Sequence, residues 1–501
     1  MSGFLCWPLG VVVGVLVLTP RLAMAQSPAE EYWFVVEMQG QRCGHMHVQT
    51  AHEGGRFKDS SEMRMEIKRG EVNMPVSILT EFVETDDGKP VRMKAETKLG
   101  ALPTVDEYTF KPDGVDVAHT LMGSRRTEKK PLPDGEWLTP MGMEKAIAAK
   151  IAGGLKPGDE FSVRSVDPAA GLKPTTTTMK LVEKTTVDVV GKTVPALKWT
   201  SRNDLVPNAT STEFTDEKGQ PLRTEMSLGG IKMVMLRADK ALALSKADPP
   251  ELLESTFIKP DKQVPNARDC KRAVFVARAE GVPIGDWPSA GAQTATKLDE
   301  HTVRLREDAA GASAPAKGEL EADEFRKPSS LINSDDSEVL KIEKQALAGR
   351  EQQSKPEQAE ALRKFVFGYI TKKNFDVGFA SAAETARTRC GDCTEHAVLL
   401  CALLRADGIP ARCVSGLVYA DGIAKDGSGA MGYHLWTQAI LQQDGSPRWV
   451  DLDAALSESR SMDATHLAIQ SLGLADGQTV NAFMDILPTL GKLKITVESA
   501  E

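Results

Sequence analysis

Three residues whose side chains can together carry out acyl transfer fall within one stretch of the C-terminal part of the sequence: Cys393, His434 and Asp453. A thiolate can attack a carbonyl carbon, an imidazole can take up and return the proton, and a carboxylate can hold the imidazole in place. The surrounding pattern predicts that the cysteine opens a helix, the histidine lies on a strand and the aspartate closes the next strand. We therefore expect a nucleophile, its base and the group that orients the base.

The predicted helix that begins at Cys393 affects the chemistry of its thiol. Asp392 can cap this helix, and Gly408 can end it. One apolar face follows the helical spacing and consists of Ala397, Leu400, Cys401 and Leu404. Unpaired N–H groups and the positive end of the helix stabilise a thiolate, which lowers the pKa of a thiol from its free value of roughly 8.5. The backbone N–H of Cys393 is also placed to donate to an oxyanion.

Three strands are predicted after this helix, at residues 410–419, 433–441 and 448–453. Because alternate residues of a strand share a face, His434 lies with Trp436 and Gln438, and Asp453 lies with Trp449 and Asp451. Residues 421–431 are rich in glycine and small residues, and we expect them to form a flexible lip over the cleft.

These linked segments resemble the core of the transglutaminase-like superfamily. The matching residues are Gly391-Asp392-Cys393, Ala397, Leu403-Leu404-Arg405, Gly408-Ile409-Pro410-Ala411-Arg412, Gly416, His434-Leu435-Trp436, Trp449 and Asp453. The resemblance implies that Cys393 is the nucleophile, His434 the base and Asp453 the third member of the triad. It covers roughly residues 331–460 and implies a papain-like α+β core that transfers an acyl group from an amide. We expect neither a cofactor nor a metal.

The chain departs from the family's pattern in two places. Ala454-Ala455 stands where the family often has a proline and a threonine, and residues 331–390 contain no tryptophan to serve as a side-chain oxyanion donor. No calcium loop of the animal enzymes is visible. Water or an amine can resolve the thioester, so the family implies either a peptidase or an acyltransferase acting on a protein or peptide. The competing hypothesis is a catalytically inactive scaffold in a multidomain binding protein.

For each proposed site residue, the sequence also allows another role or another candidate residue. Cys390 and Cys393 have the Cys-x-x-Cys spacing of a disulfide or redox pair, and with His396 and Cys401 they form a possible zinc set. His396 competes with His434 as the base. Asp451 competes with Asp453, because both lie on one face of the same predicted strand; the family pattern favours Asp453.

The N-terminal residues 1–25 resemble a signal peptide, with an apolar run at residues 9–18 and a cleavage site after Ala25. The run is too short to span a bilayer comfortably, so we expect no stable membrane span after cleavage. The protein is then secreted or periplasmic. Six cysteines remain after cleavage, and we expect at most one or two disulfides among them.

Composition and length limit the remaining possibilities. The chain has 501 residues, of which 41% are hydrophobic and 26% charged, and its formal net charge is −9. A chain of this length predicts several domains, and an acidic chain without a basic arm is not expected to bind nucleic acid. We predict a β-rich domain at residues 26–250, a small β-rich domain with a mobile linker at residues 251–330, and the catalytic domain at residues 331–501.

The N-terminal half is predicted to consist mostly of short antiparallel strands joined by tight turns. Two stretches, at residues 81–92 and 213–223, resemble each other and indicate either a duplicated unit or two independent hairpins. A helix is expected between Thr139 as its cap and Gly153-Gly154 as its end. His45 and His47 can share one strand face as metal ligands, but exposed strand histidines are the simpler interpretation.

Overall fold

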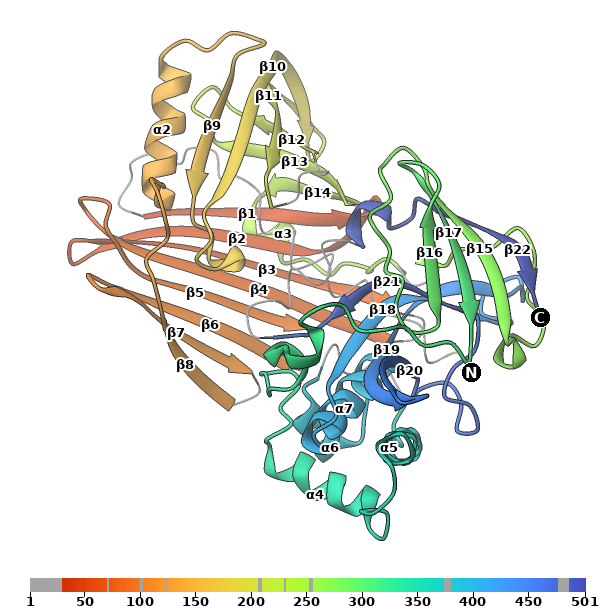
Figure 1. The fold of residues 1–501 in the computed structure, drawn as a ribbon. Coiled ribbons are helices and arrows are strands. Elements are labelled where there is room, and N and C mark those ends of the chain that lie inside the picture. The colour runs from red at the N-terminus through yellow and green to blue at the C-terminus, as the bar shows by residue number, and fades with distance from the viewer. Residues whose placement is uncertain are drawn as a thin grey trace. The chain divides into compact units, whose positions relative to one another are not determined.

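Figure 1 shows the fold of the chain in a computed structural model. The structure describes residues 29–69, 72–99, 102–121, 124–205, 210–228, 231–251, 256–373, 380–475 and 486–501. The predicted signal peptide at residues 1–25 therefore lies outside the described residues. Within the described ranges, no helix is both long enough and apolar enough to cross a membrane.

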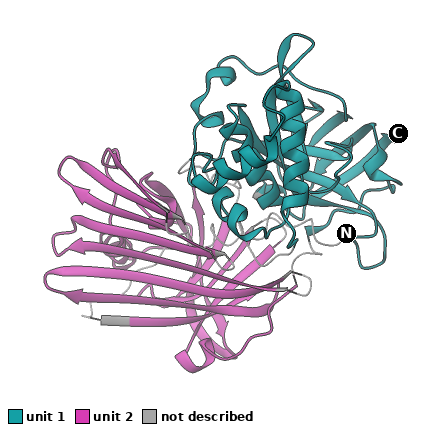
Figure 2. Ribbon diagram, turned by 90° about the horizontal axis from the view of Figure 1, so that it is seen from below, with its two compact units in different colours: residues 1–11, 252–501 teal, residues 12–251 magenta. Residues whose placement is uncertain are grey.

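The chain divides into two compact units between residues 251 and 252 (Figure 2). The N-terminal unit is built on one antiparallel sheet of 14 strands, in the order β8-β7-β6-β5-β4-β3-β2-β1-β14-β13-β12-β11-β10-β9. Its first eight strands are β1 (Ala29–Met38), β2 (Gln41–Glu53), β3 (Arg56–Arg69), β4 (Val72–Thr85), β5 (Pro90–Leu99), β6 (Leu102–Lys111), β7 (Gly114–Leu121) and β8 (Ser124–Lys130). The other six are β9 (Glu160–Ser165), β10 (Thr175–Val189), β11 (Lys192–Asn203), β12 (Thr210–Thr215), β13 (Pro221–Leu228) and β14 (Ile231–Ala238).

The two similar stretches of the sequence form the hairpins β4–β5 and β12–β13, and their turns share one hydrogen-bond pattern. Thr85 N–H donates to Lys89 O and Gly88 N–H to Thr85 O, while Asp216 N–H donates to Gln220 O and Gly219 N–H to Asp216 O. In both hairpins the strand register shifts just before the turn. The shared pattern fits either origin, because identical turn chemistry favours identical geometry.

The helix expected in this unit is α2 (Pro140–Ala152). The hydroxyl of Thr139 accepts from the N–H of Gly142, a proline stands in the first turn, and Gly153 is the C-cap. A short helix, α3 (Lys240–Ala243), follows the sheet and is capped by Asp239. The sequence signals for α2 were local capping residues, which explains why both of its ends were predicted correctly.

The C-terminal unit contains four helices among its described residues: α4 (Ser337–Leu347), α5 (Lys355–Tyr369), α6 (Ala382–Thr388) and α7 (Cys393–Ala406). Asp336 caps α4, and Ser354 caps α5 with Glu357 in a capping box. The predicted start of α7 is confirmed. Helix α6 was not predicted; it is capped by Ser381 and packs against α7.

Two four-stranded antiparallel sheets complete this unit, ordered β16-β17-β15-β22 and β20-β19-β18-β21. The first contains β15 (Arg272–Ala279), β16 (Gln293–Lys297), β17 (Thr302–Asp308) and β22 (Leu493–Ala500). The second contains β18 (Ala411–Ala420), β19 (Ala430–Gln443), β20 (Ser446–Leu452) and β21 (His466–Leu472). The α+β core of helices packed on an antiparallel sheet, preceded by β-structure, is therefore present as predicted.

Residues 251–330 do not separate from the residues that follow them. The C-terminal strand β22 pairs with β15 along its whole length. Gln293, at the start of β16, also exchanges two hydrogen bonds with the backbone of Ala468 in β21. The structure thus shows one compact unit where the sequence suggested two domains. The prediction separated them because local sequence signals do not report pairing between distant strands.

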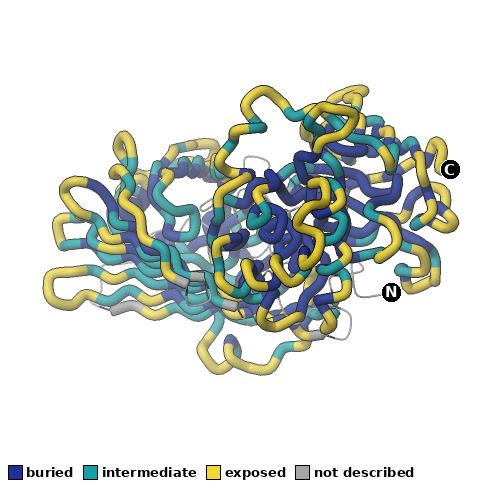
Figure 3. The backbone as a smooth tube through the Cα atoms, turned by 60° about the horizontal axis from the view of Figure 1, so that its bottom comes forward, coloured by how far each residue is buried: buried dark blue, intermediate teal, exposed yellow. Residues whose placement is uncertain are grey.

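Strands β18 and β19 are buried along most of their length, and Figure 3 shows how buried and exposed residues are distributed along the chain. Nine of the ten residues of β18 and the first twelve of β19 are buried. A strand that is buried on both faces must be covered on both sides. Helix α7 packs against β19 and β18, and backbone of residues 290–292 approaches the opposite side at Asp451.

Candidate active site

Helix α7 places Cys393 at its first residue. The carboxylate of Asp392 accepts from the N–H of Thr394, and Glu395 donates its backbone N–H to Asp392 while its own carboxylate accepts from the Asp392 N–H. This reciprocal capping fixes the first turn of the helix. The Cys393 side chain is fully buried.

The carboxyl group of Glu395 also holds the chain that leads into the helix. It accepts from the N–H of Ala380, and a Cβ on Gly391 would lie only 2.3 Å from Glu395 Cβ. Glycine at position 391 is therefore a steric requirement. Burial, and next the charge of Asp392, raise the pKa of Glu395 well above its usual value.

Strand β19 is fastened to α7 one turn after Cys393. The hydroxyl of Thr437 donates to the carbonyl of Ala397 at 3.0 Å. His434 lies three residues before Thr437 and shares its strand face with Trp436, whose ring stacks near the imidazole. Strand alternation thus places His434 with Trp436, as the sequence predicts.

His434 and Asp453 are joined directly. Nε2 of His434 lies 2.9 Å from Oδ2 of Asp453, and Oδ1 of Asp453 accepts from the N–H of Ala455. Burial alone would raise the pKa of Asp453, but the imidazoles of His434 and His466 lower it well below its usual value. Nδ1 of His434 is buried and has no hydrogen-bond partner among the described residues. This nitrogen is consequently the one available for proton exchange.

Asp451 occupies a different environment from Asp453. Its carboxylate accepts from Trp436 Nε1, Gln438 Nε2 and the N–H of Ala292. Burial raises its pKa despite these three donors. Of the two aspartates that the sequence left in competition, Asp453 is the one bonded to His434. Asp451 instead binds side chains of β19 and the backbone of Ala292.

His396 lies one turn after Cys393 in α7 and is held by the helix itself. Its Nδ1 lies 2.6 Å from the carbonyl oxygen of Asp392. Burial lowers its pKa to about 4, so it is neutral at physiological pH. The charge of Asp453 acts on this imidazole, which places Asp453 in the neighbourhood of the first turns of α7.

His466, the first residue of β21, was not predicted from the sequence as a site residue. Its Nε2 lies 3.1 Å from the same Oδ2 of Asp453 that His434 contacts. Strand β21 pairs with β18, where His466 is opposite Val418. A histidine thirteen residues beyond the expected triad carries no local signal, because only this pairing brings it to Asp453.

The cysteine alternatives do not fit the structure. Six cysteines are described, all are buried and none forms a disulfide: Cys43, Cys270, Cys390, Cys393, Cys401 and Cys413. The Cys390–Cys393 disulfide is therefore not formed. Within the described ranges, the proposed zinc set of Cys390, Cys393, His396 and Cys401 does not converge either, since the one group close enough to share an ion is His434, Asp453 and His466.

This last group is a poor metal centre in the state observed. A metal ligand needs a nitrogen lone pair, whereas Nε2 of His434 and Nε2 of His466 both face Oδ2 of Asp453 at hydrogen-bond distance. Two nearby carboxylates raise the pKa of His466 to about 10 against the effect of burial, so its ring keeps both protons at neutral pH. The donor set fits a hydrogen-bonded triad better than an ion.

The other candidate metal ligands, His45 and His47, lie in the N-terminal unit. His47 stacks on Trp33 with ring centroids 4.1 Å apart, and its Nε2 lies 3.0 Å from Glu31. His45 is half-buried beside the same tryptophan. These contacts with an aromatic ring and a carboxylate explain the two histidines without a metal ion.

A comparison with known protein families identifies the family to which this region is similar. The model of the transglutaminase-like superfamily matches residues 342–454, which include Cys393, His434 and Asp453. Residues 342–454 belong to the transglutaminase-like superfamily. The resemblance expected from the sequence is confirmed for this part of the chain, and the transglutaminase-like region has a cysteine-enzyme-like fold. No curated protein matches this chain.

Two solved structures share features with parts of the chain. A beta-barrel-like protein of domain of unknown function DUF1849 from Brucella abortus is 12% identical, with a TM-score of 0.32, over 43% of this chain and 98% of that one. A candidate cysteine protease from Cytophaga hutchinsonii is 15% identical, with a TM-score of 0.28, over 46% of this chain and 89% of that one. At such low TM-scores neither likeness supports a conclusion about the transglutaminase-like region.

Proposed function

We propose that this protein is an exported cysteine enzyme that forms a thioester on Cys393 from an amide or peptide carbonyl of a protein or peptide substrate. The observation that carries the proposal is the hydrogen bond of His434 Nε2 to Asp453, which leaves Nδ1 of His434 without a described partner. The position of Cys393 at the start of α7, which packs on the strand that carries His434, supports the same reading.

The reaction begins with transfer of the Cys393 thiol proton to Nδ1 of His434. The thiolate then attacks the carbonyl carbon, a C–S bond forms, and the carbonyl electrons move to oxygen. The backbone N–H of Cys393 and the positive end of α7 stabilise that oxyanion. Collapse of the tetrahedral intermediate breaks the C–N bond, and His434 returns its proton to the leaving amine. Water or a second amine then attacks the thioester and releases Cys393.

The ion pair of thiolate and imidazolium depends on Asp453. Asp453 holds His434 through Nε2, and its negative charge faces the positive charge that the imidazole acquires when it takes up the thiol proton. Asp453 remains ionised well below neutral pH. The triad is therefore set up to keep Cys393 reactive at pH values where an ordinary thiol is protonated.

All three side chains are covered in this structure. Cys393 and His434 are fully buried, and 4% of the Asp453 side chain is exposed. A substrate carbonyl can reach the thiol only when covering segments move. Small alkylating reagents are thus better first probes than peptides.

The proposal is tested by the pH dependence of iodoacetamide labelling at Cys393, measured by mass spectrometry in the wild-type protein, His434→Ala and Asp453→Asn. We expect rapid labelling below about pH 7 in the wild type and its loss in both variants. Cys270, whose thiol pKa is raised mainly by burial, is an internal control in every sample. Equal labelling of Cys393 in all three proteins, with the profile of an ordinary thiol, would contradict the enzyme and favour a scaffold. Glutamine peptides with and without amines then separate hydrolysis from acyl transfer.

A further inference from the structure

The carboxylate of Asp453 serves two histidines. His434 Nε2 and His466 Nε2 lie 2.9 Å and 3.1 Å from the same oxygen, Oδ2, and the two ring centroids are 5.6 Å apart. The second oxygen of Asp453 accepts from the Ala455 N–H. Three donors from three segments of chain therefore fix one carboxylate.

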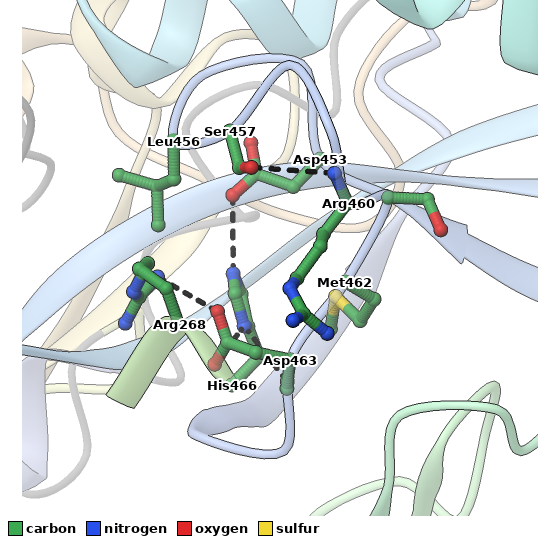
Figure 4. A pocket seen from close by; sticks show the side chains of 9 residues that line it. Arg268, Asp453, Leu456, Ser457, Arg460, Met462, Asp463 and His466 are labelled. Atoms are coloured by element: carbon green, nitrogen blue, oxygen red, sulfur yellow. Dashed lines mark hydrogen bonds and ion pairs between the residues drawn. The ribbon is translucent and has the colours of Figure 1, made fainter. Parts of the chain in front are cut away.

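His466 is itself held in place from its other side. Its Nδ1 lies 3.1 Å from the carbonyl oxygen of Asp463 and 3.3 Å from the carboxylate of the same residue. Arg268 forms an ion pair with Asp463 at 2.8 Å, and Figure 4 shows the resulting row of Arg268, Asp463, His466 and Asp453. His466 and Asp463 are buried, whereas Arg268 is partly exposed. The row thus links the interior of the site to the surface through alternating charges.

The groups around His466 favour its charged form. Asp453 and Asp463 contact it directly. Glu307 from β17 and Asp451 from β20 lie near it, but burial raises the pKa of both of these carboxyl groups. The ring of Trp436 meets the His466 ring edge to face at 5.3 Å. Burial opposes a charge here, but the adjacent carboxylates outweigh it and raise the pKa of His466 to about 10. At neutral pH the imidazole is therefore a cation with two N–H donors.

We propose that His466 is a positioning residue of the triad: backed by Asp463 and Arg268, it fixes the carboxylate of Asp453 so that His434 presents Nδ1 for proton exchange. This inference rests on the proposed function of Cys393. A rotating carboxylate would let His434 turn or change tautomer, and the proton-accepting nitrogen would then face the wrong way. His466 prevents this by occupying the part of Oδ2 that His434 does not use.

The decisive comparison is between His466→Gln and His466→Ala. The amide introduced by His466→Gln can still donate to Asp453, whereas His466→Ala removes both the donor and the charge. With iodoacetamide as the probe, we expect His466→Ala to slow labelling of Cys393 at pH 6.5 by about tenfold, which corresponds to a rise of about one unit in its thiol pKa. His466→Gln should retain labelling within about threefold of wild type. His301→Gln, at a partly buried histidine bonded to Val282 O, is the matched control.

Asp463→Asn gives a second variant that leaves His466 in the protein. We expect it to slow Cys393 labelling in the same direction as His466→Ala, and far-ultraviolet circular dichroism checks that each variant folds. If Cys393 is activated in the wild type and both His466→Ala and Asp463→Asn keep the wild-type pH profile, the positioning role is wrong. A general loss of packing would slow His466→Gln as much as His466→Ala, and that result would also overturn the inference.

Side-chain nitrogen NMR of histidine-labelled protein separates this inference from the proposed function. We expect the Nε2–H of His434 that faces Asp453 to be fixed in the wild type, whether or not Nδ1 also carries a proton, and to lose this fixed position in His466→Ala. If the Nε2–H is released in His466→Ala while wild-type Cys393 labels as an ordinary thiol, the positioning role holds and the enzyme proposal fails. If the Nε2–H of His434 is held equally in both proteins, the positioning role fails whatever Cys393 does.

Discussion

The hydroxyl of Thr437 donates to the carbonyl oxygen of Ala397 at 3.0 Å, and this bond ties strand β19 to the first part of helix α7. Cys393 lies four residues before Ala397, and His434 lies three residues before Thr437. The bond therefore sets the longitudinal position of the helix that carries the proposed nucleophile against the strand that carries its proposed base. Thr437 is fully buried, so no water replaces the contact in the folded state.

We predict that Thr437→Val lowers the reactivity of Cys393. Valine keeps the shape of threonine but cannot donate, and losing a buried hydrogen bond costs about 1 kcal/mol of folding free energy. Urea titration should show this loss, and iodoacetamide labelling at pH 6.5 should slow because α7 is less firmly registered on β19. Thr294→Val, at an exposed position of β16, is the control. Unchanged labelling in Thr437→Val would mean that other contacts set the register.

Gly416 lies opposite His434 in the pairing of β18 with β19, and it is predicted to tolerate no side chain. A Cβ at this position would lie 2.1 Å from the carbonyl oxygen of Leu467 and 2.7 Å from the Trp436 ring. Because one of these atoms belongs to backbone, relief requires strands to move apart. We expect Gly416→Ala to cost at least ~2 kcal/mol of stability and to abolish fast labelling of Cys393.

A matched substitution for Gly416→Ala is Gly285→Ala. Gly285 is exposed, and a Cβ there meets nothing within 4 Å. Thermal unfolding of both variants should show a clear drop for Gly416→Ala and little change for Gly285→Ala. Similar unfolding temperatures for the two would contradict the close approach of β18 to β21 at this point.

Local chemistry made part of this site predictable from the sequence. Asp392 and Thr139 cap helices through bonds that span only two or three residues, so the starts of α7 and α2 could be predicted directly from the sequence. Alternation along a strand likewise placed His434 with Trp436. The family pattern then favoured Asp453 over Asp451, and the hydrogen bond to His434 is made by Asp453.

Contacts between distant strands were not predictable in this way. His466 reaches Asp453 only because β21 pairs with β18, and residues 251–330 join the C-terminal unit only because β22 pairs with β15. The hydrogen bond of Gln293 to Ala468 spans 175 residues of sequence. Such contacts depend on the order and register of distant strands, which periodicity and turn residues do not predict.

The charge on His466 predicts a specific dependence of stability on pH. Its pKa is about 10 in the folded protein against 6.5 as the ordinary value, so the folded state holds a proton that the unfolded chain releases between these pH values. The stabilisation is complete below pH 6.5 and is lost as pH rises through 10, with a slope of up to ~1.4 kcal/mol per pH unit. Urea titrations at several pH values in this range should show that the free energy of unfolding changes less steeply with pH for His466→Gln than for wild type. Parallel slopes would show that the ring is neutral in the folded protein.

The N-terminal unit contains a buried carboxyl group with the same kind of testable consequence. Glu213 in β12 is hydrogen-bonded to Ser201 at 2.5 Å and to Ser211 at 3.2 Å, and burial raises its pKa to about 7. Below about pH 4.5 both the folded and the unfolded chain hold this proton. As pH rises toward 7 the unfolded chain releases it first, so stability falls by ~3 kcal/mol in total.

Replacing Glu213 with glutamine should therefore stabilise this unit above neutral pH and leave it nearly unchanged at pH 4.5. Hydrogen exchange measured by mass spectrometry on β11 and β12 peptides reports the N-terminal unit separately from the other. We expect greater protection in Glu213→Gln than in wild type at pH 8, because the amide needs no charge to remain buried. Glu217→Gln, at an exposed turn position nearby, should leave protection unchanged. Equal protection of Glu213→Gln and wild type at pH 8 would show that Glu213 ionises in place without cost.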